Sequence, residues 1–153
     1  MDYPVIWDPL RKKEVPLTPE ERVRQWFIGI LGRECGVPGH MMMSEVEFSY
    51  GSSGLKKIYR ADIVVYDRKP SPVMIVECKR PEVEIDKTVM MQALRYDAVM
   101  GVRFIAVTNG RKTCICRKAD DGTLVFLDTA PNYTEMTGDI IGKVHNKATE
   151  SED

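Results

Sequence analysis

The stretch "VMIVECKRPE", residues 73–82, sets the direction for interpreting this sequence. Four apolar residues lead into Glu77, Cys78 and Lys79, and Pro81 follows at once. The apolar run is typical of a buried strand. Side chains alternate along a strand, so the carboxylate of Glu77 and the ammonium group of Lys79 point to the same side. The sequence therefore predicts a buried strand that ends in a pair of opposite charges.

The preceding segment "YRADIVVY", residues 59–66, predicts the neighbouring strand. The connection at residues 67–72, "DRKPSP", contains two prolines and is too short for a crossover helix, which favours an antiparallel hairpin. If the hairpin is symmetric about its turn, Asp62 lies directly opposite Glu77. The two carboxylates then share a sheet face with Lys79.

Opposed residues of this kind have Cβ atoms about 4.5–5.5 Å apart. Two carboxylates at that separation repel by roughly 3–4 kcal/mol at an effective dielectric constant near 20. Lys79 offsets part of this repulsion, and a divalent cation would offset the rest. Mg²⁺ suits such a site because it takes one or two carboxylates, keeps several waters and accepts phosphate oxygens. We therefore expect Asp62 and Glu77 to bind metal, with the backbone carbonyl of Cys78 as a further ligand. The alternative is a surface Glu77–Lys79 ion pair with Asp62 as a strand-edge cap.

A helix is predicted to begin after Thr18. This residue is a suitable N-cap, Pro19 fits the first helical position, and Glu21 completes a capping box. The helix is expected to end near Gly32 or Gly36. Its predicted apolar stripe consists of Val23, Trp26, Phe27, Ile30 and Leu31.

The remaining pattern predicts a strand over 41–50, a turn at 51–54, a helix over 87–100 capped by Asp86, and a strand over 102–108. A final hairpin is expected from residues 114–118 and 124–128. Because a helix separates the strand at 73–79 from that at 102–108, these two strands are expected to be parallel. The prediction is an α/β fold: a central mixed sheet flanked by helices, in the order α-β-β-β-α-β-β-β.

The chain has 153 residues, a length typical of one domain. We expect an extended lead-in over 1–17, a folded domain over 18–135 and a flexible acidic tail over 136–153. There is no run of 18 apolar residues and no basic leader followed by an apolar segment, so neither a membrane span nor a signal peptide is predicted. The four cysteines suit reduced core thiols, which favours a cytoplasmic location. The net charge of −1 neither favours nor excludes nucleic acid as a partner.

Asp62 followed by Glu77-Cys78-Lys79 on the next strand resembles the signature of PD-(D/E)XK nucleases, with Ala61 in place of the proline. The ordered set of "TPEERVRQ" at 18–25, "RADIVVYD" at 60–67, "IVECKRPEV" at 75–83, Gln92 with Tyr96, and "TNG" at 108–110 is similar to the N-terminal nuclease domain of type I restriction enzyme R subunits. It is most similar to small stand-alone proteins related to that domain. The resemblance extends from about residue 5 to residue 133.

This resemblance implies a restriction-endonuclease-like fold and a Mg²⁺-dependent (or Mn²⁺-dependent) DNA endonuclease. It also implies that Gln92 and Tyr96, four residues apart on one helix face, border the active site. Tyr96 also lies in an apolar stripe, so core packing is an equal alternative. For the acidic residue of the first helix, the pattern Glu20-x-x-x-Arg24 favours Glu20, because Glu21 already has a capping role.

Several basic residues near the expected site are candidates for holding a DNA backbone. Such contacts position nucleic acid without reading its sequence, so little sequence specificity is expected. The alternative for most of them is a solvated charged surface. The candidates are Lys57, Arg60, Arg80, Arg95 and Arg111, with Tyr96 beside them and Lys56 and Lys112 nearby.

In the predicted mechanism Asp62 and Glu77 hold the metal, Lys79 serves the attacking water, and Glu20 and Gln92 support them. The sequence contains no Walker A motif, so classical restriction would need partner subunits. Action alone in another defence or repair task is the other possibility. The alternative function is a catalytically silent nucleic-acid-binding or assembly module on the same scaffold. The sequence leaves the oligomeric state open.

Overall fold

A computed structural model describes residues 2–51 and 54–138. The predicted acidic tail falls mostly on residues 139–153, outside the described part. The described chain forms two sheets and three α-helices. In chain order the elements are β1 Val5–Asp8, β2 Lys13–Pro16, α1 Pro19–Arg33, the 3₁₀ turn η1 Gly39–Met41, β3 Met42–Tyr50, β4 Lys57–Tyr66, β5 Pro72–Cys78, α2 Lys87–Met100, β6 Phe104–Thr108, β7 Thr113–Lys118, β8 Leu124–Leu127 and α3 Tyr133–Thr137.

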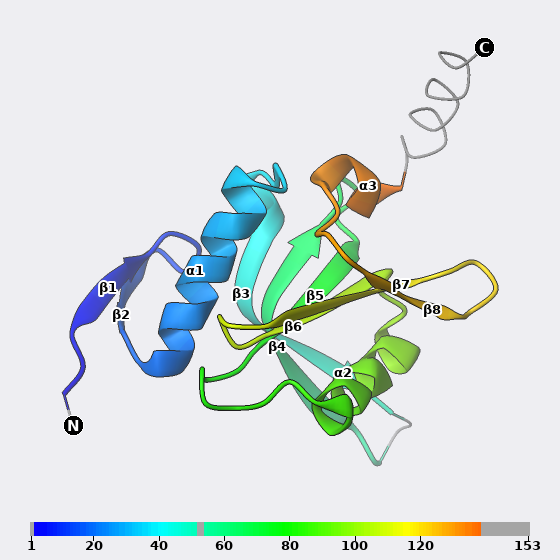
Figure 1. Ribbon diagram of the computed structural model, residues 1–153, viewed down its shortest axis with the longest axis horizontal. Helices are drawn as coiled ribbons and strands as arrows, with labels where there is room; N and C mark the ends of the chain where they lie inside the picture. The colour runs from blue at the N-terminus through cyan, green and yellow to red at the C-terminus, as the bar shows by residue number, and fades with distance from the viewer. Residues whose placement is uncertain (1, 52–53, 139–153) are drawn as a thin grey trace, which may run out of the picture.

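The central sheet contains six strands in the order β3-β4-β5-β6-β7-β8 (Figure 1). β5 and β6 are parallel, and all other neighbours in this sheet are antiparallel. α1 packs on one face through Val23, Phe27 and Leu31, and α2 packs on the other through Met90 and Ala93. The predicted α/β class and the mixed sheet are confirmed. The predicted order α-β-β-β-α-β-β-β is also confirmed, as α1-β3-β4-β5-α2-β6-β7-β8. No helix among the described residues is long and apolar enough to cross a membrane.

The start of α1 agrees with the sequence prediction. The Thr18 hydroxyl accepts the Glu21 backbone N–H at 3.1 Å, and Pro19 is the first helical residue. The predicted burial of the helix is partly wrong, because Trp26 is 42% exposed whereas Glu21 and Arg24 are buried. The helix is covered along a second side by the segment before it, so polar residues outside the apolar stripe are also enclosed.

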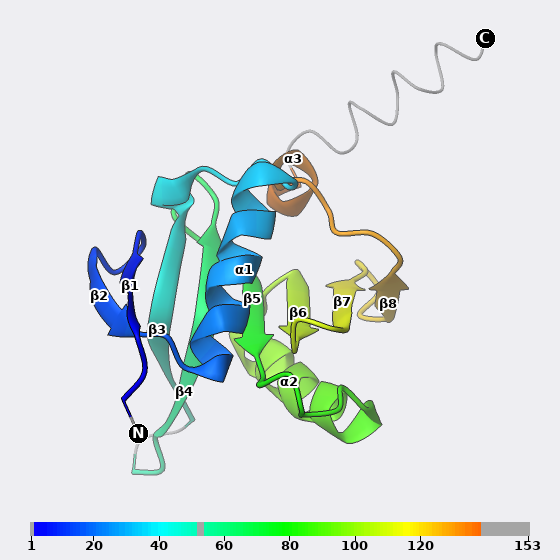
Figure 2. The ribbon, with the colours of Figure 1, turned by 60° about the vertical axis from the view of Figure 1, so that its left-hand side comes forward.

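That covering segment is the β1–β2 hairpin, where the sequence predicted only an extended lead-in over 1–17. Its strands pair from Val5↔Pro16 to Asp8↔Lys13. Asp8 is fully buried and Val15 is 4% exposed, so the hairpin is packed against the rest of the protein. Figure 2 shows β1 and β2 beside β3. The folded part therefore begins well before residue 18.

At the other end, α3 extends past the expected domain boundary at residue 135. Met136 is fully buried in the core cluster that contains α1. The Tyr133 hydroxyl donates to the Tyr66 carbonyl at 2.7 Å, and the Tyr133 N–H donates to the Cys35 carbonyl at the same distance. Residues 133–137 thus belong to the folded domain.

The alternation of side chains between the two faces of the sheet is interrupted in β4 at Asp62. Ala61 packs in the α2-side cluster, whereas Ile63 packs in the α1-side cluster, although strict alternation would place both on one face. In β3 the ladder skips the corresponding position, Glu45, which has a left-handed φ of 53°. The β3–β4 strand pair is therefore twisted at Glu45 and Asp62. Beyond this point, residues 46–50 of β3 and 57–61 of β4 pack on the α2 side of the sheet.

Candidate active site

The register of the β4–β5 hairpin is the one predicted from its turn. Ile63 pairs with Val76 and Val64 pairs with Ile75, which is the offset that the prediction used for Asp62 and Glu77. The Cys78 backbone N–H donates to Asp62 Oδ2 at 2.6 Å. Asp62, Glu77 and Lys79 therefore lie together where β5 ends.

Burial strongly affects the carboxyl group of Asp62. Its pKa is raised to about 6, chiefly because burial disfavours the charged form. The Cys78 N–H and the Arg24 guanidinium lower this pKa, whereas Glu77 and Glu20 raise it. The sequence reasoning considered only the repulsion by Glu77. In the structure burial is the larger cause of the raised pKa, and Glu77 adds to it.

Glu77 is held by two groups. The Tyr59 hydroxyl donates to Glu77 Oε1 at 2.5 Å, and Lys79 Nζ lies 3.8 Å from Glu77 Oε2. The Lys79 backbone N–H donates to the Thr108 carbonyl at 2.8 Å, which fixes the chain beyond β5. The Lys79 side chain remains 33% exposed and can reach a ligand.

Tyr59 was not predicted as a site residue. Strict alternation along β4 places residue 59 on the face opposite Asp62. Because the alternation of β4 side chains is interrupted at Asp62, the Tyr59 ring is instead buried on the α2 side of the sheet. It stacks against Phe48, with the ring centroids 6.5 Å apart. The sequence signal was present only as an aromatic residue at the start of an otherwise ordinary strand.

A pocket of about 670 Å³ opens beside Glu77 and Lys79. Gln92, which is exposed on α2 and which the family resemblance places beside the active site, lines this pocket. Three of the predicted backbone-binding cations also line it: Lys57, Arg60 and Arg95. Arg60 is partly neutralised by Glu47, with Nη2 2.7 Å from Oε1. The pocket therefore combines one carboxylate with several cationic groups, which suits a polyanionic ligand.

Other residues with predicted roles lie outside this lining. Asp62 and Glu20 lie deeper, toward α1, and Glu20 is close enough to raise the pKa of Asp62. Arg80 is exposed and lies 3.4 Å from Glu82, and Arg111 is exposed between β6 and β7. The side chain of Tyr96 is not among those that the structure describes.

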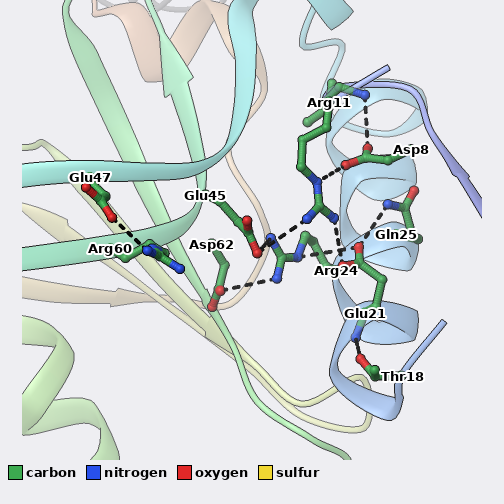
Figure 3. Close-up of polar contacts among 11 residues, drawn as sticks. Asp8, Arg11, Thr18, Glu21, Arg24, Gln25, Glu45, Glu47, Arg60 and Asp62 are labelled. Atoms are coloured by element: carbon green, nitrogen blue, oxygen red, sulfur yellow. Dashed lines mark hydrogen bonds and ion pairs between the residues drawn. The ribbon is translucent and has the colours of Figure 1, made fainter. Parts of the chain in front are cut away.

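Arg24 links Asp62 to a buried network of charges (Figure 3). Its side chain is 6% exposed. Arg24 Nη2 lies 3.7 Å from Asp62 Oδ1, Nη1 lies 3.3 Å from Glu45 Oε1, and Nε lies 3.5 Å from Glu21 Oε2. Glu21, the competing acid of the first helix, also accepts from Arg11 and Gln25. The sequence assigned no role to Arg11, Arg24 or Glu45.

The residues present fit a hard divalent cation. Asp62 and Glu77 would supply oxygen ligands, and burial raises the pKa of Asp62, so a nearby cation would favour its charged form. No metal-binding group of three or more His, Cys, Asp or Glu side chains occurs within the described ranges. An ion at this site would thus take further ligands from the Cys78 carbonyl, water and substrate, as Mg²⁺ commonly does.

A six-stranded mixed sheet between helices, with Asp62 on its second strand and Glu77 and Lys79 at the end of its third, defines a restriction-endonuclease-like α/β protein. The family model described as type I restriction enzyme R protein N terminus matches residues 19–131, and the chain belongs to this family.

The fold is also similar to that of a fragment described as an HsdR subunit of a type I restriction enzyme from Vibrio vulnificus YJ016. The TM-score is 0.61 at 21% sequence identity. The match covers 82% of this chain and 26% of that one, so the present chain spans about a quarter of that fragment. No curated protein matches.

Proposed function

We propose that this protein is a Mg²⁺- or Mn²⁺-dependent endonuclease that hydrolyses DNA phosphodiester bonds. One observation carries the proposal. Glu77 and Lys79, at the end of β5, face a pocket lined by Lys57, Arg60 and Arg95, and Asp62 lies behind them against the Cys78 N–H. This arrangement supplies oxygen ligands for a metal and cations for phosphates around one space.

In this proposal Asp62, Glu77 and the Cys78 carbonyl hold the divalent ion, which supplies positive charge for the phosphoryl oxygens. Lys79 orients the attacking water and stabilises the negative charge that develops on the phosphoryl group. Its 3.8 Å separation from Glu77 Oε2 leaves the ammonium group free to donate to a ligand in the pocket.

The supporting residues act from the pocket walls. Gln92 orients a phosphate or the attacking water from α2, and the Glu20 carboxylate adds negative charge behind Asp62. Lys57, Arg60 and Arg95 bind the DNA backbone, and Arg80 and Arg111 contact phosphates farther from the pocket. Tyr96, on the same helix as Gln92, contacts the same nucleic acid.

The test is cleavage of linear, nicked, branched and single-stranded DNA in Mg²⁺, Mn²⁺ or EDTA. We expect metal-dependent cleavage of at least one substrate by the wild type and none by Asp62→Asn or Lys79→Ala. DNA binding without cleavage under every condition would instead support a catalytically silent binding module.

The family suggests a setting for this activity. We propose that the protein works with restriction-modification subunits, or in another defence or repair task, and that it acts in the cytoplasm. Cys35 and Cys78 are buried free thiols, which suits a reducing compartment.

A further inference from the structure

We infer that the β1–β2 hairpin is part of the framework of the active site, and that Arg11 and Arg24 are positioning residues that hold Asp62 in place for metal binding. The inference rests on the proposed metal site. It extends the site to the β1–β2 hairpin and Arg11, which the family match does not include, because that match begins at residue 19.

Arg24 is the group that positions Asp62 from the α1 side. The residue is 5% exposed, and its Nε and Nη1 atoms make no hydrogen bond within the described residues. Its charge is instead shared among Asp62, Glu45 and Glu21, at 3.3–3.7 Å. Directional hydrogen bonds from the described residues thus do not fix the Nε and Nη1 atoms of this guanidinium. Its position therefore depends on where Glu21 and Glu45 lie.

Arg11 fixes both of these carboxylates. Its Nη2 atom lies 2.7 Å from Glu21 Oε1, and its Nη1 atom lies 3.3 Å from Glu45 Oε1. The same Glu45 oxygen also faces Arg24, so this carboxylate bridges the two guanidiniums. Arg11 therefore acts on Arg24 through two intermediate acids.

The position of Arg11 is set in turn by the hairpin. Arg11 lies in the β1–β2 turn, and its Nε atom pairs with the carboxylate of Asp8. Asp8 is fully buried and also accepts the Leu10 backbone N–H at 3.0 Å. The Lys12 N–H donates to the Asp8 carbonyl at 2.8 Å, which closes the turn. The hairpin thus presents Arg11 toward α1 and β3 in a defined geometry.

Backbone strain at Glu45 supports a specific role for these contacts. Glu45 has a left-handed φ of 53° in the middle of a strand, a strained conformation for a non-glycine residue that persists only where the surroundings impose it. Here Arg11 and Arg24 hold the Glu45 side chain from two elements. Glu45 lies opposite Asp62 in the β3–β4 pair, at the point where this pair is twisted.

The charge balance of the network favours an added cation. Its four carboxylates belong to Asp8, Glu21, Glu45 and Asp62, and its two guanidiniums to Arg11 and Arg24. When all are ionised the formal charge is −2. A divalent ion at Asp62 would balance this charge. Displacement of Arg11 or Arg24 would move the Asp62 carboxylate and so change how it binds the ion.

The experiment compares Arg11→Lys with Val15→Ala in the full chain. Lysine keeps the charge, so no buried carboxylate is left without a cation, but one ammonium group cannot contact Asp8, Glu21 and Glu45 together. Val15 is buried in the same hairpin and lies outside the charge network, so its substitution loosens the hairpin through packing alone. Mn²⁺ affinity is measured without DNA by isothermal titration calorimetry, with thermal unfolding alongside.

We expect Arg11→Lys to weaken Mn²⁺ binding by about tenfold or more, as is typical when a group that orients a metal ligand is changed. Val15→Ala should lower the melting temperature and leave Mn²⁺ affinity within about twofold. Arg24→Lys, tested in the same way, should weaken binding at least as much. Unchanged affinity in Arg11→Lys, or equal losses in Arg11→Lys and Val15→Ala, would overturn the inference.

The metal readout separates this inference from the proposed function. A wild type that binds Mn²⁺ but cleaves no DNA refutes the proposed function, and the comparison of the variants still decides the inference. A wild type that cleaves DNA, with Arg11→Lys and Arg24→Lys binding Mn²⁺ normally, refutes the inference alone.

Discussion

The replacement Asp62→Asn should stabilise the metal-free protein at neutral and alkaline pH. The carboxyl group of Asp62 has a pKa of about 6 in the folded protein, against an ordinary value of 3.8. A raised pKa means that the folded state favours the neutral form. The neutral carboxyl therefore contributes its full stability below pH 3.8, and this contribution is lost as the pH rises through about 6.

The magnitude follows from the size of the pKa shift. A shift of about two units, at about 1.4 kcal/mol each, corresponds to about 3 kcal/mol of unfolding free energy above pH 7. The Asp62 side chain is 16% exposed, so solvent screening reduces this figure, and we expect a gain of about 1–3 kcal/mol. Asparagine can still accept the Cys78 N–H, and Arg24 keeps Glu21 and Glu45 as partners.

The assay is urea unfolding in EDTA at several pH values between 4 and 8. The stability difference between Asp62→Asn and the wild type should be largest at pH 8 and should shrink toward pH 4. Asp67→Asn is the matched control from the same hairpin. The Asp67 carboxylate accepts the Lys69 and Ser71 N–H groups, and the Ser71 contact chiefly lowers its pKa. Asp67→Asn should therefore lose stability at pH 8, and most of this loss should remain down to about pH 5, because the contribution of a carboxylate with a lowered pKa fades only near and below the ordinary value of 3.8.

Divalent metal supplies the second part of this test. Mg²⁺ or Mn²⁺ should stabilise the wild type, by about 2.7 kcal/mol at a concentration one hundred times the dissociation constant. The same addition should have little effect on Asp62→Asn, which lacks a ligand. If Asp62→Asn is destabilised at pH 8 and metal changes neither protein, Asp62 is a structural partner of Arg24 and Cys78 and the metal site is wrong.

Three further substitutions test the pocket. Lys79→Ala should abolish cleavage while leaving Mn²⁺ and DNA binding largely intact, because its role is in the transition state; wild-type cleavage rates would contradict this. Gln92→Ala should slow cleavage and lower the melting temperature by no more than roughly 1–2 °C, because the residue is exposed. A large loss of stability would instead place Gln92 in a structural network. Tyr59→Phe removes the donor to Glu77 and should weaken Mn²⁺ binding by about tenfold in calorimetry. Unchanged affinity would show that the hydroxyl does not position Glu77.

The central sheet was predictable because its signals are local. A short connection with two prolines fixes the β4–β5 hairpin, and its symmetry gave the register in which Ile63 pairs with Val76. The capping residues Thr18 and Asp86 likewise marked the starts of α1 and α2. Gln92 was placed at the pocket through the family resemblance.

The charged network was not predictable by the same reasoning. Arg11, Glu45 and Arg24 come from a turn, a strand and a helix, and no spacing in the sequence relates them. The sequence also gave Glu21 only a capping role outside the apolar stripe, yet Glu21 is buried and pairs with Arg11 of the β1–β2 hairpin. Tyr59 was missed because alternation was assumed to continue through Asp62. Pairings between distant segments, and a backbone turn imposed by them, leave no periodic signal in the sequence.

The structure also explains why Asp62 is suited to bind a cation despite the nearby arginine. Arg24 lowers the pKa of Asp62, yet that pKa remains near 6 because burial outweighs the attraction. The guanidinium lies 3.7 Å from Asp62 Oδ1 and is shared with Glu21 and Glu45, so it balances only part of the Asp62 charge. A closer, exclusive ion pair would neutralise the carboxylate and compete with a metal. By sharing Arg24 among three acids, the network keeps Asp62 oriented and leaves a deficit of positive charge that a divalent ion can fill.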